Sequence, residues 1–308
     1  MNPAPSPLVR GIVPPLATPL ASFDALDRPG LEALVERLVA ARVNALFILG
    51  TTGEGPALSH KLRAEVVERV CESVRGRVPV LVGITDTSFA ESLRLSAIAA
   101  KAGATAVVAA PPFYFPYGQT ELLRYVVSLA TESPLPLFLY NQPALTKISF
   151  EPNTVAQAAE IPQIVGVKDS SGQIDYIRSV LSLMSEKRPD FAVLVGPEHL
   201  LAESLISGAH GGVPGGANIF PYLTVRLYEL FLQGQITEML NVQREIVSIG
   251  SAIWRTGEDD SSYLRRLKCA LSVLGICSGV PAFPYTESDA AERLEIEVHL
   301  RRHNLVSG

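Results

Sequence analysis

The chain has 308 residues, a formal net charge of −5 at neutral pH, and a composition that is 47% hydrophobic. This length allows either one large domain or two small ones, with a substantial core. Acidic and basic residues are mixed along the chain, so there is no basic region of the kind that binds nucleic acid or an anionic membrane. No apolar segment approaches the roughly 18 residues of a membrane-spanning helix, and the start does not resemble a targeting signal. We therefore expect a soluble, cytoplasmic protein without nucleic-acid or membrane partners.

Short apolar runs that end in Gly, Pro or Asn alternate with longer stretches of helical periodicity, which is typical of a parallel sheet wrapped by helices. Eight such runs predict strands at Gly11–Thr18, Ala45–Gly50, Val78–Ile84, Ala106–Pro111, Leu135–Asn141, Ile164–Asp169, Ala192–Gly196 and Gly211–Gly215. Helices are expected between and after them, at 31–42, 60–75, 88–102, 120–132, 152–159, 174–186, 198–207 and 221–233. Eight strand and helix pairs predict a closed (β/α)8 TIM barrel. A doubly wound sheet usually has fewer strands and a glycine fingerprint after the first strand, where this chain has Ala17-Thr18-Pro19.

Beyond the barrel the chain remains helical in character. Three further amphipathic stretches are expected at 235–255, 259–276 and 286–302. We therefore predict a flexible N-terminal tail at 1–8, the barrel at 9–233, and a C-terminal helical subdomain at 234–308.

The cysteines and histidines do not indicate a metal site. Cys71, Cys269 and Cys277 are odd in number and lack metal or redox spacing, so free thiols are expected. The five histidines form neither a His-x-His nor a His-Glu-x-x-His motif, so we expect no tightly held catalytic metal.

Lys168 is the most informative residue, because it ends the apolar run Ile164-Val165-Gly166-Val167, which reads as a buried parallel strand. An ammonium group there must be paired, lie at the open end of the strand, or lose its proton. A free amine attacks ketones and forms a Schiff base. The alternative is a lysine just past the strand end with its head group in water.

Reactive groups of a (β/α)8 barrel lie at the carboxyl ends of the strands. The turn Gly50-Thr51-Thr52-Gly53 offers N–H groups and two hydroxyls to an anion such as a carboxylate, or is a plain turn. Tyr140 ends a strand and is either a proton-transfer group beside the amine or a core tyrosine. Glu54 follows the turn, and we expect it to hold the loop rather than act as a base.

Three motifs carry a resemblance to a known family. Gly50-Thr51-Thr52-Gly53-Glu54, Tyr140-Asn141-x-Pro143 and Gly166-Val167-Lys168-Asp169-Ser170-Ser171, in this order and at these separations, resemble the dihydrodipicolinate synthase and N-acetylneuraminate lyase family of class I aldolases. The resemblance covers about residues 9 to 300. It implies that the partners are a 2-oxo acid and an aldehyde, and that no cofactor is needed, because the covalent iminium is itself the electron sink.

The resemblance also implies the roles of individual residues. Lys168 would form the Schiff base with pyruvate or another 2-oxo acid, and Tyr140 would shuttle protons. Thr51 and Thr52 would bind the 2-oxo acid carboxylate. Tyr114, in Pro112-Phe113-Tyr114, would reach across a subunit contact into the neighbour's site, so a homo-oligomer, either a dimer or a tetramer, is expected.

The sequence departs from the dihydrodipicolinate synthases at one informative position. Those enzymes have an arginine two residues after the proline of Tyr-Asn-x-Pro, where it pairs with the carboxylate of aspartate semialdehyde, and this chain has Leu145. Leucine cannot form that pair, although Lys147 is close enough to compensate. A 2-keto-3-deoxy sugar acid is therefore the expected substrate of an aldolase reaction. The synthase, N-acetylneuraminate lyase and 2-keto-3-deoxy acid dehydratase activities remain alternatives.

The neuraminate lyases have an Asp-Glu pair and a serine where this chain has Glu198-His199 and Gly215. This difference weakens the hypothesis that sialic acid is the substrate. We expect Ser170, Glu198, Gly215 and Asn218 to line the substrate site. Glu198 and His199 could instead cap a helix. Two other classes of protein are alternatives. A regulator that only binds 2-oxo acids is disfavoured, because it has no need of an amine that reacts covalently. A metal-dependent aldolase or a phosphate-binding barrel is disfavoured, because the sequence has neither clustered metal ligands nor a phosphate-binding loop.

Overall fold

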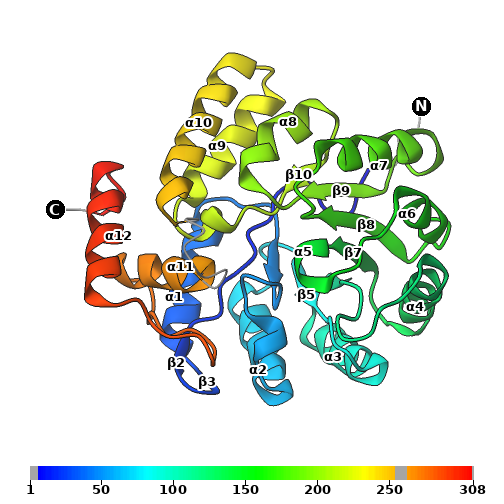
Figure 1. Ribbon diagram of the computed structural model, residues 1–308, viewed down its shortest axis with the longest axis horizontal. Helices are drawn as coiled ribbons and strands as arrows, with labels where there is room; N and C mark the ends of the chain where they lie inside the picture. The colour runs from blue at the N-terminus through cyan, green and yellow to red at the C-terminus, as the bar shows by residue number, and fades with distance from the viewer. Residues whose placement is uncertain (1–5, 254–261, 307–308) are drawn as a thin grey trace.

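A computed structural model describes residues 6–253 and 262–306 and confirms the (β/α)8 barrel with additional C-terminal helices (Figure 1). Its parallel sheet has the strand order β1-β10-β9-β8-β7-β6-β5-β4. The strands are β1 (Gly11–Ile12), β4 (Leu46–Ile48), β5 (Val80–Gly83), β6 (Ala106–Ala109), β7 (Leu137–Asn141), β8 (Ile164–Asp169), β9 (Ala192–Val195) and β10 (Gly211–Gly212). All eight fall within the predicted strand ranges.

The barrel closes between β1 and β4, the two strands at the ends of this order. The N–H of Leu16 donates to the carbonyl of Phe47 over 2.8 Å, and the N–H of Phe47 donates to the carbonyl of Pro14 over 3.0 Å. Regular strand geometry nevertheless ends at Ile12, short of the predicted Thr18. Pro14 and Pro15 explain this, because proline has no N–H to contribute to the ladder.

A ring of helices surrounds the strands (Figure 1). These helices are α1 (Arg28–Ala40), α2 (His60–Val74), α3 (Phe89–Ala102), α4 (Gln119–Glu132), α6 (Pro152–Ala158), α7 (Ile174–Lys187), α8 (Leu201–Ile206) and α9 (Pro221–Leu232). Several begin at a capping residue: the hydroxyl of Ser59, for example, accepts a hydrogen bond from the N–H of Leu62 at the start of α2. Their apolar faces pack on the outside of the sheet and form the larger hydrophobic core.

A second, smaller core fills the inside of the barrel. It contains Phe47, Val108, Phe138, Tyr140 and Leu194, together with smaller side chains from the other strands. Lys168 is paired in register with Tyr140 on one side and with Leu194 on the other, so it lies on this inner face. The residue predicted to be reactive therefore points into the barrel.

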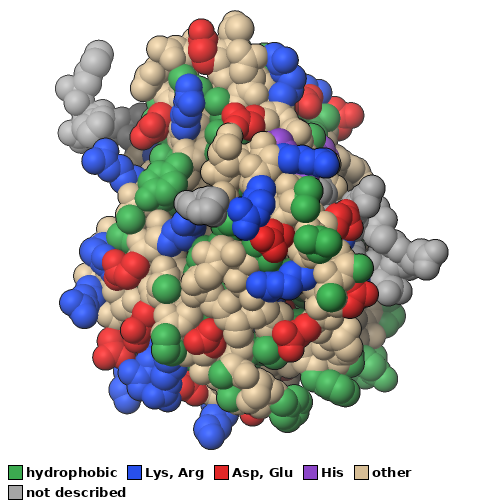
Figure 2. Space-filling view, turned by 90° about the vertical axis from the view of Figure 1, so that its left-hand side faces the viewer, with side chains coloured by type: hydrophobic (Ala, Val, Ile, Leu, Met, Phe, Trp, Pro, Cys, Tyr) green, Lys and Arg blue, Asp and Glu red, His purple; other side chains and the backbone are tan. Residues whose placement is uncertain are grey.

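The C-terminal helices are α10 (Ile236–Ile253), α11 (Ser262–Val273) and α12 (Ala290–Arg302). They gather on one side of the ring, beside α1 and α9 (Figure 1). On the face that they present, acidic and basic side chains are interspersed (Figure 2). None of the helices in the described ranges combines the length and apolar character needed to cross a membrane.

The structure departs from the predicted elements in several places. A short antiparallel hairpin, β2 (Leu20–Ser22) and β3 (Ala25–Leu26), follows the first strand, and a single turn of helix, α5 (Pro143–Thr146), follows β7; neither was predicted. The helix predicted at 198–207 is divided into η2 (Glu198–Leu200) and α8. Short turns η1 (Gly55–Ala57) and η3 (Gly215–Asn218) follow β4 and β10. Residues 1–5 of the predicted tail lie outside the described residues, as do 254–255 of the helix predicted at 235–255 and 259–261 of the helix predicted at 259–276.

Candidate active site

Lys168 lies at the carboxyl end of β8 and is withdrawn from water, with only 6% of the residue exposed. Its Nζ is 4.1 Å from the centroid of the Tyr140 ring and 4.9 Å from that of Phe47. These distances are within the range in which an aromatic face attracts a cation. The alternative of a lysine with its head group in water is therefore wrong, and the amine lies in an aromatic enclosure.

Tyr140 connects this enclosure to the turn after β4. Its phenolic oxygen is 3.0 Å from Oγ1 of Thr51, and either group can be the donor. Tyr140 also packs edge to face against Phe47, with ring centroids 6.1 Å apart. A hydroxyl chain thus leads from the rings around Lys168 to the Gly50–Gly53 turn.

A polar network locks the ends of β7 and β8 together. Nδ2 of Asn141 donates to Asp169 over 2.7 Å, and the hydroxyl of Ser171 donates to the same carboxyl over 2.9 Å. Burial raises the pKa of Asp169, although these hydrogen bonds act in the opposite direction. Asn141 follows Tyr140 and Asp169 follows Lys168, so the pairing fixes the side chains of Tyr140 and Lys168 beside each other.

The Gly50–Gly53 turn is held by unusual backbone on both sides. Leu49, just before it, and Glu54, just after it, have φ values of 57° and 56°, in the left-handed region that costs energy for residues other than glycine. The carboxylate of Glu54 forms a buried ion pair with Lys268 of α11 and accepts a hydrogen bond from the N–H of Ala282 over 2.7 Å. As expected, Glu54 holds the loop.

The turn itself presents donors at the mouth of the barrel. The backbone N–H groups of Thr51 and Thr52 have no acceptor among the residues that the structure describes. Successive free N–H groups of this kind form a concavity that suits an anion. The turn can therefore offer backbone donors to an anion, and the binding of a carboxylate there stays a prediction.

Thr52 has a partner that the sequence did not reveal. Its Oγ1 is 2.7 Å from the phenolic oxygen of Tyr263, on α11. Gly215 makes room for this tyrosine, because a Cβ added at Gly215 would lie 2.4 Å from the Tyr263 hydroxyl. Burial raises the pKa of Tyr263, as do the nearby Glu198 and Tyr140, while the hydrogen bond to Thr52 acts in the opposite direction.

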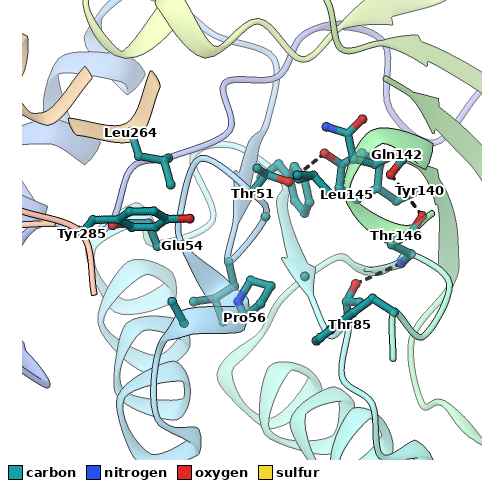
Figure 3. A pocket seen from close by; sticks show the side chains of 17 residues that line it. Thr51, Glu54, Pro56, Thr85, Tyr140, Gln142, Leu145, Thr146, Leu264 and Tyr285 are labelled. Atoms are coloured by element: carbon teal, nitrogen blue, oxygen red, sulfur yellow. Dashed lines mark hydrogen bonds between the residues drawn. The ribbon is translucent and has the colours of Figure 1, made fainter. Parts of the chain in front are cut away.

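A cavity of about 230 Å³ opens beside Thr51 and Tyr140 (Figure 3). Leu264 and Tyr285, from the C-terminal part of the chain, line it on the side opposite Tyr140 and Leu145 (Figure 3). Leu145 is 55% exposed at this wall and presents an apolar side chain in place of the arginine expected of a synthase. Nζ of Lys147 donates to the carbonyl of Ala144 over 2.7 Å at the surface.

The remaining candidate residues have different surroundings. Glu198 is buried, accepts a hydrogen bond from the N–H of Gly216, and lines a second cavity of about 380 Å³ with Gly215 and Tyr263. Ser170 lies against Gly196 at the end of β9. Asn218 is fully buried, and both N–H bonds of its amide are used, on the carbonyls of Pro15 and Gly215. It therefore holds the backbone together and has no free N–H to offer a substrate.

Tyr114 is apart from these groups within one chain. It is 77% exposed and packs against the ring of Phe115, with centroids 5.0 Å apart. Phe113 of the same loop lines the 230 Å³ cavity. Among the described residues, no group of three or more His, Cys, Asp or Glu side chains is arranged to hold a metal ion.

The profile of the dihydrodipicolinate synthetase family matches residues 8–303. The chain belongs to this family. A dihydrodipicolinate synthase of Bacteroides thetaiotaomicron superimposes with a TM-score of 0.93 at 48% identity, covering 96% of this chain and 99% of that one. The 4-hydroxy-tetrahydrodipicolinate synthase of Methanopyrus kandleri is 32% identical over 94% of this chain and 95% of that protein. The family resemblance carried by the three motifs is confirmed.

A third member of the family has a different name. YagE of Escherichia coli K12, provisionally named a 2-dehydro-3-deoxy-D-gluconate aldolase, is 32% identical over 79% of this chain and 81% of its own length. Its structure in complex with pyruvate superimposes with a TM-score of 0.91, over 97% of this chain and 99% of that one. Relatives in this family are thus named both as synthases and, provisionally, as an aldolase, and membership alone does not define the substrate of this chain.

Proposed function

We propose that this protein is a class I aldolase in which Lys168 forms a Schiff base with the ketone of pyruvate or another 2-oxo acid. The observation that carries the proposal is the position of Lys168: its amine is buried against Tyr140 and Phe47 and is joined through Tyr140 to the hydroxyl of Thr51. Burying an amine among aromatic rings costs folding free energy. A buried titratable group at the carboxyl end of a barrel strand is therefore a candidate for catalysis.

The reaction follows from this arrangement. Nζ of Lys168 attacks the ketone carbon, C2, and water leaves to give an iminium. In the cleavage direction the C4 hydroxyl loses its proton, the C3–C4 bond breaks, and its electron pair flows into the iminium to form an enamine. The aldehyde departs, the enamine takes a proton at C3, and hydrolysis releases the 2-oxo acid and the free lysine.

Tyr140 is assigned the proton transfers. Its phenol lies over the amine and is 3.0 Å from the Thr51 hydroxyl, which can deliver or accept the proton in turn. Thr52 and the N–H groups of the turn then remain for the carboxylate of the 2-oxo acid. Thr51 is accordingly given a proton-relay role beside the carboxylate-binding role expected from the sequence.

The preferred substrate is a 2-keto-3-deoxy sugar acid. Leu145 supports this, because it provides no cation for an aldehyde that carries a carboxylate, and the name of YagE agrees. Glu198 and Gly215 line the second cavity with Tyr263, and we expect them, together with Ser170, to contact the hydroxyl tail. The second candidate is 4-hydroxy-tetrahydrodipicolinate synthase, which the names of other relatives favour.

We propose further that the active form is a homo-oligomer, either a dimer or a tetramer. Tyr114 and Phe115 expose more apolar surface than the loop of a monomer usually does. Light scattering should show a dimer or tetramer that Tyr114→Asp weakens. A fully active monomer would contradict the assembly without affecting the assignment of Lys168.

Trapping with borohydride tests the proposed reaction. After incubation with pyruvate and borohydride, peptide mapping should find the reduced pyruvate adduct on Lys168, and the Lys168→Arg variant should carry none. The buried Lys268 is the internal control and should stay unmodified. An unmodified Lys168 at saturating pyruvate would exclude the proposed function.

A further inference from the structure

Tyr263 of α11 reaches the turn that is proposed to bind the 2-oxo acid. Its hydroxyl is 2.7 Å from Oγ1 of Thr52, although the two residues are 211 positions apart in sequence. Thr51 and Thr52 therefore each have a tyrosine partner, Tyr140 from the barrel and Tyr263 from the C-terminal helices. Tyr140 lies against the amine of Lys168, whereas Tyr263 reaches Thr52 from α11, outside the barrel.

The position of α11 relative to the turn is fixed by a second contact. Lys268, later in the same helix, forms the ion pair with Glu54, and both side chains are almost fully buried. Lys268 also donates to the carbonyl of Val280 over 2.8 Å. Because α11 holds the turn at both Thr52 and Glu54, the Tyr263 hydroxyl is presented to Thr52 from a rigid support.

Gly215 is required for this approach. A Cβ at position 215 would lie 2.4 Å from the Tyr263 hydroxyl oxygen, much closer than the two atoms can come. Any larger residue would displace the phenol from Thr52. The glycine that begins η3, just after the eighth barrel strand, is thus explained by the tyrosine that it accommodates.

The direction of the hydrogen bond between Thr52 and Tyr263 determines what Thr52 can do. Threonine has one O–H, and its oxygen can also accept. If Thr52 donated to Tyr263, no hydroxyl proton would remain for a substrate carboxylate. If Tyr263 donates to Thr52, the O–H of Thr52 is free. The phenolic O–H of Tyr263 is more acidic than the aliphatic O–H of Thr52, so Tyr263 is the stronger donor and Thr52 the stronger acceptor across their 2.7 Å contact.

We propose that Tyr263 is a positioning residue that donates its phenolic proton to Thr52 and thereby leaves the Thr52 hydroxyl to donate to the carboxylate of the 2-oxo acid. The proposal rests on the proposed function and adds a group from outside the barrel to its substrate site. Tyr263 acts on substrate binding and Tyr140 on proton transfer, so the two tyrosines should affect different kinetic constants.

The test is a double-mutant cycle between Tyr263 and Thr52. Tyr263→Phe should raise the KM for the 2-oxo acid substrate about tenfold, as expected for a weakened hydrogen bond to a charged group, and should leave kcat within about twofold. Thr52→Val should raise KM at least as much. In the Thr52→Val background, Tyr263→Phe should have almost no further effect, because the phenol would have nothing left to orient.

Two further variants serve as control and as confirmation. Tyr228→Phe removes a phenol from another buried tyrosine, on α9 beside Arg10, and should leave both constants unchanged. Gly215→Ala should displace the Tyr263 hydroxyl and raise KM while Tyr263 itself stays in place. In the Tyr263→Phe background the same Gly215→Ala change should cost much less.

The outcomes separate this inference from the proposed function. An unchanged KM in Tyr263→Phe, or additive effects of Tyr263→Phe and Thr52→Val, would overturn the role of Tyr263 even if borohydride traps pyruvate on Lys168. If Tyr263→Phe did not fold, additive effects of Gly215→Ala and Thr52→Val would overturn it in the same way. The absence of a Lys168 adduct in the unmodified protein would instead exclude the proposed function and this inference with it.

Discussion

Lys168 and Lys268 are both buried, yet their surroundings are opposite. Lys268 is 1% exposed and forms an ion pair with Glu54, and its amine also donates to a backbone carbonyl. Lys168 faces two aromatic rings, and no carboxylate is within ion-pair distance of its Nζ among the residues that the structure describes. Burial by itself therefore does not identify a reactive lysine. The partners of the two amines differ: the carboxylate of Glu54 commits the amine of Lys268 to a structural role, whereas the amine of Lys168, which is proposed to react, faces aromatic rings.

The same isosteric change should separate the two lysines. In Lys168→Met, turnover should fall by on the order of a thousandfold or more, because the covalent electron sink is lost. The free energy of unfolding should stay the same or rise, since an apolar side chain replaces a buried amine that has no carboxylate partner. Steady-state assays and urea unfolding measure the two effects. Residual turnover above about a tenth of the original would contradict the assignment.

Lys268→Met should have the reverse effect. It leaves the carboxylate of Glu54 buried without its partner, so the free energy of unfolding should fall by about 3–5 kcal/mol. Adding Glu54→Gln should recover part of the loss, because the uncompensated charge is removed. Urea unfolding of the two variants gives the comparison. Equal stability of Lys268→Met and the unmodified protein would show that the pair is not structural.

Tyr140→Phe tests whether the ring beside Lys168 is only packing or also transfers protons. We expect kcat to fall about 100-fold while the fold is retained, as is typical of the loss of a general acid-base group. Trapping of pyruvate on Lys168 should become slower, since carbinolamine dehydration also needs a proton. Unchanged kcat would reduce Tyr140 to a core tyrosine.

The smallest expected effect concerns which aldehyde the enzyme prefers. A carboxylate placed against Leu145 would lack a charged hydrogen bond of roughly 1.5–3 kcal/mol, which is about a tenfold to hundredfold loss in kcat/KM. Pyruvate with glyceraldehyde should therefore be a better pair than pyruvate with aspartate semialdehyde, and Leu145→Arg should narrow the difference. A preference of the unmodified protein for aspartate semialdehyde would make the synthase activity the first choice and would implicate Lys147.

The sequence predicted the barrel and the positions of the motif residues, because both depend on local patterns. Apolar runs separated by helical periodicity specify the strands, and Lys168 is conspicuous within such a run. The sequence pattern also predicts that Lys168 and Tyr140 lie close to each other, since consecutive strands of a parallel barrel are neighbours in the sheet.

Tyr263 could not be predicted, because its function depends on a contact across most of the chain. It lies in an ordinary amphipathic helix with no motif around it. The only sequence signal is Gly215, which differs from the serine of the neuraminate lyases but does not reveal which side chain uses the space. Leu264 and Tyr285 were missed for the same reason, and so was the backbone role of Asn218.

The helices after the barrel are more than an appendage, because α11 supplies Tyr263, Leu264 and Lys268 at the mouth of the barrel. The natural point for dividing this protein in sequence, between α9 and α10, is therefore not a boundary of the site. A fragment that ended there would keep Lys168 and Tyr140 but lose a wall of the cavity and the support of its turn. Chimeras that exchange the last helices between relatives should accordingly transfer part of the substrate preference with them. Variation in these helices offers a route to new specificity that leaves Lys168 unchanged.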